Sequence, residues 1–351
     1  MSTDFTTILE RLECPAFIVE NGIITHTNHK ASAFAFLVGQ NISDRIIIGA
    51  STYESFPSGQ LYLTLSADEI PICACVTRNN TYDLFCIESE YDDLQLRTFA
   101  LVSQILREPL SGAMNAVDAL NATSASNEDN AQLRILNKNL HRILRAVCNL
   151  SDASVPDAAY AQKTQNCIIN SVISRIAHNA ADALKTTGIK VEYISSPDAI
   201  HCAIDVEKIE RALLNMISNA AKFSDPGESI KVQAYRANAR YNISVTSLCQ
   251  NAKGVIEQSF FSRFGRNPGI ENPSTGIGLG MTLIRNAAIA HEGTVLVDTP
   301  DEQHLRVTMS LSIKQNRTNT LRSPIVFETD YSGGYDHILL ELSDILDPNH
   351  Y

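Results

Sequence analysis

The chain has 351 residues, of which 44% are hydrophobic, and its formal net charge is −11. This length predicts two or three domains, and the acidity argues against nucleic acid or an anionic membrane surface as a main partner. No apolar run is long enough to cross a bilayer, and the first residues lack the blocks of a signal peptide. We therefore expect a cytoplasmic protein without membrane insertion. The 8 cysteines fit neither a redox motif nor a zinc site, so buried free thiols are expected.

Residues 1–90 alternate short apolar runs with Asn, Gly and Asp turns. The pattern predicts a hairpin over residues 15–26, a short helical stretch over 29–37, and then three more strands. The predicted strands are Gln60–Ser66, Pro71–Thr77 and Asp83–Ile87. Two strands, a few helical turns and a three-stranded meander resemble a PAS sensor domain. A generic small α+β module is the alternative.

Residues 91–155 change to helical spacing. Apolar residues recur every three or four positions over 91–120 and again over 133–150, and a polar run over 121–130 separates the two stretches. Pro109 should kink or locally unwind the first helix. An antiparallel hairpin cannot bury both of its faces alone, whereas two copies can do so as a four-helix bundle. The segment therefore predicts a homodimer.

Residues 160–314 predict a mixed α/β domain, and its most informative helix ends in L-L-N-M-I-S-N-A-A-K-F. Asn215 and Asn219 are four residues apart and share a face, and Lys222 lies on the next turn. Amide oxygens can join a Mg²⁺ shell that phosphate oxygens and water complete, and lysine can bind the same phosphates. Asn disfavours helix interiors, so the pair indicates a site. The alternative is an amphipathic helix with two exposed asparagines.

A glycine-rich run, S-T-G-I-G-L-G, precedes a helix predicted over 279–291. Gly276 and Gly278 would let the backbone approach phosphates, in front of a helix N-terminus that favours negative charge. Together the two motifs resemble the N-box and the second glycine box of the sensor histidine kinases. The resemblance implies a GHKL-type (Bergerat) α/β sandwich. It also implies an ATP and Mg²⁺ site at these glycines and at the Asn215, Asn219 and Lys222 face, with Asn215 and Asn219 as the metal ligands.

The family's adenine-binding D-x-G-x-G motif is altered in this chain. Ser247 stands at the Asp position, and Cys249 and Asn251 stand at the Gly positions. Losing a charge-assisted hydrogen bond should cost on the order of tenfold in affinity, and two side chains in place of glycines would obstruct the pocket. The resemblance therefore implies that binding of ATP and Mg²⁺ is weak or lost.

The run V-S-Q-I-L-R-E-P-L over residues 102–110 resembles the family's phosphoacceptor box, V-S-H-E-L-R-T-P-L. Gln104 stands at the reacting histidine and Ile105 at the adjacent acid. The amide nitrogen is delocalised and is not a nucleophile, and isoleucine cannot take up a proton. His141 could serve as another acceptor, but an exposed helix histidine without a special role is favoured.

The sequence thus predicts an α+β multidomain protein. Its parts are a PAS-like sensor domain over 1–90, a dimerisation and phosphotransfer-like hairpin over 91–155, an ATPase-like domain over 160–314 and a C-terminal extension over 315–351. The extension should hold a short amphipathic helix over 338–346.

The resemblance implies two-component signalling, with a second copy and a response regulator or another histidine kinase as partners. The leading hypothesis is a pseudokinase that regulates by dimerisation and partner binding. One alternative is a sensor kinase that retains weak ATP binding or hydrolysis, or that uses another acceptor. The other is a scaffold whose PAS-like module binds a small ligand.

Overall fold

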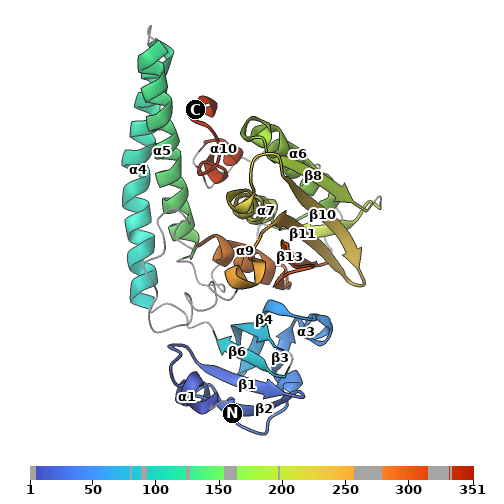
Figure 1. The fold of residues 1–351 in the computed structure, drawn as a ribbon. Coiled ribbons are helices and arrows are strands. Elements are labelled where there is room, and N and C mark those ends of the chain that lie inside the picture. Colours follow the sequence, from blue (N-terminus) through green and yellow to red (C-terminus); the bar gives the residue numbers. More distant parts are fainter. Residues whose placement is uncertain are drawn as a thin grey trace. The chain divides into compact units, whose positions relative to one another are not determined.

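The computed structural model describes residues 5–79, 81–87, 93–123, 127–153, 164–196, 198–256, 279–314, 332 and 334–351 (Figure 1). The chain divides into two compact units. The N-terminal unit comprises Met1–Glu90, Cys249–Gly276 and Ala288–Ser312. The hairpin unit comprises Tyr91–Leu248, Ile277–Ala287 and Ile313–Tyr351. Within the described ranges, no helix combines the length and the apolar character needed to cross a lipid bilayer.

The N-terminal unit is built on an antiparallel sheet with the strand order β2-β1-β6-β5-β4. The predicted hairpin and meander are confirmed, while the sequence missed β3 and α3, and the predicted helical stretch shortens to α2. The elements are α1 (Phe5–Leu9), β1 (Ala16–Glu20), β2 (Ile23–Thr27), α2 (His29–Ser32), β3 (Ile46–Ile48), α3 (Ala50–Ser55), β4 (Gly59–Ala67), β5 (Ile70–Arg78) and β6 (Asp83–Ile87). The hairpin turn at Asn21 and Gly22 has positive φ at both residues, as its tight geometry requires.

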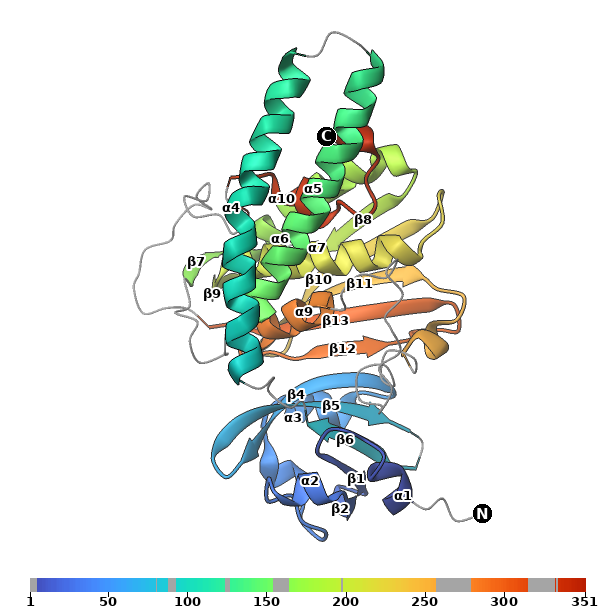
Figure 2. The same cartoon turned by 90° about the vertical axis from the view of Figure 1, so that its left-hand side faces the viewer.

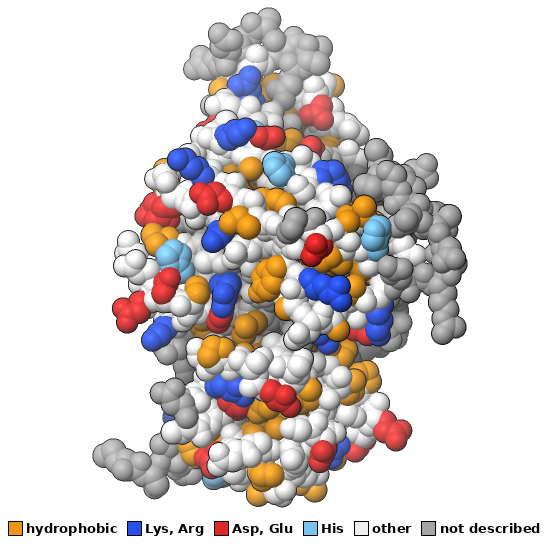
Figure 3. All heavy atoms as spheres, turned by 90° about the vertical axis from the view of Figure 1, so that its right-hand side faces the viewer, with side chains coloured by type: hydrophobic (Ala, Val, Ile, Leu, Met, Phe, Trp, Pro, Cys, Tyr) orange, Lys and Arg blue, Asp and Glu red, His pale blue; other side chains and the backbone are white. Residues whose placement is uncertain are grey.

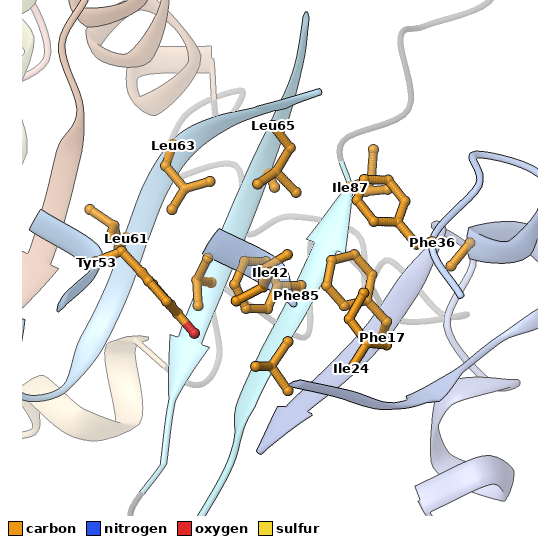
Figure 4. Close-up of a cluster of buried hydrophobic side chains, with 14 of the residues drawn as sticks. Phe17, Ile24, Phe36, Ile42, Tyr53, Leu61, Leu63, Leu65, Phe85 and Ile87 are labelled. Atoms are coloured by element: carbon orange, nitrogen blue, oxygen red, sulfur yellow. The ribbon is translucent and has the colours of Figure 1, made fainter. Parts of the chain in front are cut away.

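Aliphatic and aromatic side chains fill the core on one face of this sheet (Figure 4). Phe17 and Phe85 are cross-strand partners on β1 and β6, so their side chains point to the same face. Phe17 stacks on Phe85 and on Phe36, each at 4.8 Å between ring centroids. Because successive side chains on a strand point to opposite faces of the sheet, every second residue of β1 and β6 faces the core.

The sheet continues beyond β4 into two strands from late in the sequence, β12 (Val295–Asp298) and β13 (His304–Ser312). Strand β12 pairs antiparallel with β4, with Val297 opposite Gln60. The amide of Gln60 is buried and donates to the carbonyl of Ile256 at 3.0 Å. Strands that the sequence predicts within the ATPase-like domain are thus hydrogen-bonded to the N-terminal sheet.

Gly59 begins β4 where it meets β12, with φ at +102°, and an added Cβ would lie 2.3 Å from the carbonyl oxygen of Val297. We expect Gly59→Ala to lower the free energy of unfolding by about 2–4 kcal/mol, through backbone strain plus this clash. Gly39→Ala is the matched control, because Gly39 has φ at +92° and nothing within 4 Å of its Cβ position. Its loss should be about 1 kcal/mol. Equal losses in urea unfolding would mean that close approach to β12 is unimportant.

The hairpin unit begins with two long antiparallel helices, α4 (Asp93–Thr123) and α5 (Asn127–Ala153), which confirm the predicted helical hairpin (Figure 2). Helix α4 runs through Pro109 as one helix, so the predicted local unwinding does not occur. The seam between the helices is a buried apolar cluster that the C-terminal segment, residues 332 and 334–351, completes. Its buried members are Met114, Val117, Leu140, Leu144, Cys148 and Leu340.

The rest of the hairpin unit is a three-stranded sheet in the order β11-β10-β8, a separate β7-β9 pair and packed helices. Helix α6 packs on β8, and α7 packs on β11. Short strands β7 and β9 were missed from the sequence, whereas the longer elements were predicted. The elements are β7 (Gln165–Ile168), α6 (Ile169–Leu184), β8 (Lys190–Ser195), β9 (His201–Ile204), α7 (Val206–Phe223), β10 (Ser229–Ala237), β11 (Arg240–Leu248), α9 (Leu279–Ala290) and α10 (His337–Glu341).

Candidate functional site

Helix α7 carries the predicted asparagine face. Asp205 caps the helix by accepting from the Lys208 backbone N–H at 3.2 Å. Asn215 is fully buried and Asn219 is half-buried. A Cβ built at Gly280, in the first turn of α9, would lie 3.1 Å from the Asn215 amide oxygen and 3.6 Å from the Asn219 amide nitrogen. The start of α9 therefore meets both asparagines, while Gly276 and Gly278 lie outside the described residues.

Both ends of the Asn215 amide contact the chain's own side chains. Its oxygen accepts from Arg145 Nη2 at 3.2 Å, and its nitrogen donates to Glu341 Oε2 at 3.0 Å and to the Arg211 carbonyl at 2.9 Å. A Mg²⁺ ligand must offer its oxygen lone pairs to the metal. In this arrangement Asn215 faces a guanidinium and a carboxylate, so it does not fit a Mg²⁺ shell.

Glu341, at the end of α10, is the buried centre of this cluster. Its carboxylate accepts from Arg145 Nε at 3.1 Å and from Arg211 Nε at 3.3 Å, and its side chain is 0% exposed. Arg145 also donates to Ser218, and Arg211 donates to Asn149 on α5. A buried charge is tolerated only when it is paired and hydrogen-bonded. Glu341 therefore joins α5 to α7 through two buried arginines.

Asp344 binds the remaining cations of the cluster. Lys222 Nζ lies 2.8 Å from its Oδ2, Arg145 Nη1 donates to Oδ2 at 3.0 Å, and Arg142 Nε donates to Oδ1 at 2.9 Å. Burial would raise the pKa of Asp344, but Lys222, Arg145 and Arg142 outweigh it and lower the pKa to about 2. The lysine predicted to bind phosphate thus binds a carboxylate of the C-terminal segment, residues 332 and 334–351.

The low pKa of Asp344 predicts an acid-sensitive contact. Because the folded pKa lies below the ordinary value of 3.8, the stabilisation is complete above about pH 4 and is lost as the pH falls toward 2. We expect a contribution of about 2 kcal/mol over this range. Asp344→Asn should remove this part of the acid-induced loss in unfolding experiments at stepped pH. An unchanged pH dependence in the variant would contradict the assignment.

The altered adenine motif lies at the end of β11 and in the segment that follows. Ser247 is buried, with 3% of its surface exposed. The backbone N–H of Cys249 donates to the Gln303 carbonyl at 2.7 Å. Asn251 accepts from the Gly254 N–H at 3.2 Å through its side chain, at the start of a short helical segment. The side chain at the second glycine position therefore has a local structural role.

The predicted phosphoacceptor position lies within α4. Gln104 belongs to the helix, and the neighbouring Ile105 has 61% of its surface exposed. One turn further on, Arg107 Nη2 lies 3.4 Å from the Cys148 sulfur on α5. The acid position beside Gln104 is thus an exposed apolar side chain, which cannot accept a proton.

The prediction that His141 is exposed was wrong. The residue is only 6% exposed, because Tyr335 and Tyr351 of the C-terminal segment cover its ring at centroid distances of 5.8 and 4.7 Å. Its Nδ1–H donates to the Asn137 carbonyl at 2.9 Å, and burial lowers its pKa. With the segment docked, this imidazole is closed to a phosphoryl donor.

Sequence reasoning missed the four charged residues that hold the cluster together, which are Arg145, Arg211, Glu341 and Asp344. The spacing of Glu341 and Asp344, three residues apart, is the one local signal that could have marked them. Among the described residues, no group of three or more His, Cys, Asp or Glu side chains is arranged to hold a metal ion.

Comparison with known proteins finds one matching family model and several partial relatives. Residues 204–315 match the histidine kinase-, DNA gyrase B- and HSP90-like ATPase family. Sensor protein KdpD of Mycobacterium tuberculosis is 29% identical over 234 residues, which cover 64% of this chain and 27% of that protein. Sensor histidine kinase WalK of Bacillus subtilis is 27% identical over 240 residues, which cover 66% of this chain and 39% of that protein. The chain thus spans well under half the length of these relatives.

Among solved structures, full-length ShkA in complex with AMPPNP has a similar fold. Its TM-score is 0.50 at 20% sequence identity, over 63% of this chain and 47% of that chain. The ATPase-family match and the sensor-kinase relatives agree with the motifs on α7. Residues 204–315 therefore carry a histidine kinase-, DNA gyrase B- and HSP90-like ATPase domain, and the chain is similar to sensor histidine kinases over 64–66% of its length.

Proposed function

We propose that this protein is a two-component signalling protein that acts as a pseudokinase, by dimerisation and partner binding rather than by phosphoryl transfer. The observation that carries the proposal is Gln104 at the phosphoacceptor position of α4, beside the apolar Ile105. An amide nitrogen is not a nucleophile, and the isoleucine at the adjacent acid position cannot take up a proton. His141 is buried, which leaves it poorly placed to serve as a substitute acceptor.

In this proposal residues 1–90 are a PAS-like sensor module, 91–155 a dimerisation hairpin, 160–314 an ATPase-like domain and 315–351 a docked extension. The strand order β2-β1-β6-β5-β4, with its three-stranded meander, supports the sensor module. The protein acts in the cytoplasm, where it receives a signal through this module.

Exposed apolar side chains on the hairpin support a homodimeric four-helix bundle. Large apolar side chains on one helix pair would be buried by a second copy. The exposed residues are Val102, Ile105, Leu106, Leu120, Ile135, Leu136 and Ile143. A response regulator or another histidine kinase is the proposed further partner. The face in Figure 3 carries acidic and basic side chains interspersed, without a broad basic patch of the kind that nucleic acid requires.

A second candidate function is weak ATP binding or hydrolysis with Mg²⁺. It is favoured by Asn219, which lies half-buried beside the start of α9. The similarity to a protein solved with AMPPNP points the same way. Calorimetry and thermal shift at millimolar ATP test this candidate, and it fails if neither responds.

Incubation with γ-labelled ATP and Mg²⁺ tests the leading proposal. The chain should acquire no acid-labile label, and acid-labile label on the wild-type chain would defeat the proposal. A variant carrying Gln104→His and Ile105→Glu restores both chemical groups of the acceptor box. Label on the variant alone would locate the loss of activity at these two residues.

A further inference from the structure

The C-terminal segment lies on the Asn215 and Lys222 face of α7, which the resemblance to kinases predicts to bind the phosphates of a nucleotide. We propose that this segment is an intramolecular ligand of α7 and that polyphosphate anions compete with it for the same cations. The inference rests on the proposed assignment of α7 as the phosphate-facing helix of the domain. It adds that the C-terminal segment occupies this face of α7 and that its docking affects how α5 is held against α7.

Charge is the first observation. Four cations face two of the segment's carboxylates; the cations are Arg142, Arg145, Arg211 and Lys222, and the carboxylates are Glu341 and Asp344. Three of the cations are largely buried, with side-chain exposures of 7–17%. Buried cations without a counter-charge are strongly unfavourable. If the segment leaves, water or another anion must replace its carboxylates.

The chemistry of the contacts is the second observation. Lys222 binds Asp344 at 2.8 Å, and Asn215 donates to Glu341 at 3.0 Å. Lys222 and Asn215 are two of the residues that the sequence predicts to face phosphate. Carboxylate and phosphate oxygens use the same donors, and arginine can bind either one in a bidentate manner. The segment thus supplies oxygen atoms to the groups that a polyphosphate would bind.

The way the segment is held makes displacement possible. Helix α10 has five residues, too few to be stable by itself, so tertiary contacts maintain it. Leu340 fills the seam between α4 and α5, and Tyr351 donates from its hydroxyl to the Leu339 carbonyl at 2.6 Å. Loss of the ionic contacts of Glu341 and Asp344 would leave the apolar contacts and a few hydrogen bonds, such as those of His337 with Glu210 and Tyr335 with Ser111, to retain the segment.

Displacement would also remove the carboxylate bridges between α5 and α7. Arg145 belongs to α5, whereas Arg211, Asn215 and Lys222 belong to α7, and Glu341 and Asp344 bridge the two helices. Binding of an anion and docking of the segment are therefore negatively coupled, and the coupling must be reciprocal. Arg145 also donates directly to Asn215 and Ser218, and Arg211 donates to Asn149, so docking of the segment strengthens a contact between the hairpin and α7 that its displacement would weaken.

A fluorescence titration with inorganic tripolyphosphate, with and without Mg²⁺, tests this inference. The chain contains no Trp, so Tyr335→Trp introduces a single reporter within the segment. Saturating tripolyphosphate should shift its emission toward that of an exposed tryptophan. Glu341→Gln with Asp344→Asn in the same background should bind tripolyphosphate about tenfold more tightly. Asp344→Asn alone, which leaves the buried Glu341 intact, should give a smaller gain and guards against misfolding of the double variant.

The matched control replaces two exposed carboxylates of the same unit, Asp182→Asn and Glu192→Gln, and should leave the affinity unchanged. Equal affinities in the wild type and the double variant would overturn the inference, as would unchanged emission at saturation. Tripolyphosphate carries no adenine, so a degenerate adenine pocket does not affect the result. If the tripolyphosphate titration fails, the labelling experiment still tests the pseudokinase proposal. If the wild-type chain becomes labelled, the titration still tests whether polyphosphate competes with the segment.

Discussion

Replacing Glu341 by alanine is expected to lower the free energy of unfolding of the hairpin unit by about 3–5 kcal/mol. The carboxylate is 0% exposed and is the shared partner of Arg145 and Arg211, each of which is less than 10% exposed. Without it, both guanidinium groups are left buried with much of their charge uncompensated, and Asn215 loses an acceptor. Urea unfolding followed by circular dichroism measures the change.

Glu192→Ala is the control for the Glu341 variant. Glu192 is exposed on β8, and its loss should change the free energy of unfolding by no more than about 0.5 kcal/mol. Glu341→Gln should fall between the two, because it keeps a hydrogen-bond acceptor while removing the charge. If Glu341→Ala is as mild as the control, Glu341 does not anchor the C-terminal segment.

Introducing glutamate at both Ile105 and Ile143 is expected to dissociate the proposed homodimer, raising its dissociation constant by at least about a thousandfold. These side chains are 61% and 47% exposed on the hairpin, and each occurs twice in a symmetric dimer. Burial of a fully exposed side chain contributes about 1.5–3 kcal/mol, and these are about half exposed; a carboxylate forced into the interface adds the cost of burying a charge, so four replacements together exceed the 4.1 kcal/mol that a thousandfold change requires. Sedimentation equilibrium over a range of concentrations measures the effect.

Ile194→Glu is the matched control for this surface. Ile194 is 46% exposed but belongs to β8, away from the hairpin helices, so the dimer should persist. A wild-type chain that stays monomeric at high concentration would refute the bundle, as would a double variant that dimerises normally.

Local patterns in the sequence were sufficient to predict most of the helices and strands. Regular spacing of apolar residues predicted α4, α5, α6 and α7 and the N-terminal meander, because helix and strand periods are local properties. Short elements such as β3, β7 and β9 contain three or four residues, which is too few for a period to appear. The pairing of β12 with β4 was also out of reach, since it depends on backbone contacts between distant segments.

The candidate site could be predicted only in part, for a similar reason. The asparagine face of α7 follows from spacings of three and four residues. The salt bridge between Arg145 and Glu341 joins residues 196 positions apart, and a local sequence pattern cannot predict a contact at that separation. The prediction that His141 is exposed was wrong for the same reason: Tyr335 and Tyr351, which cover it, lie near the C-terminal end of the sequence.

The central claim is that no group on the hairpin accepts a phosphoryl group. It is tested most directly by mass spectrometry of hairpin peptides at neutral pH, after incubation with Mg·ATP and a catalytically complete sensor kinase. We predict no phosphorylation anywhere within α4 or α5. A phosphohistidine at His141, or any acid-labile phosphate between residues 93 and 153, would contradict the claim.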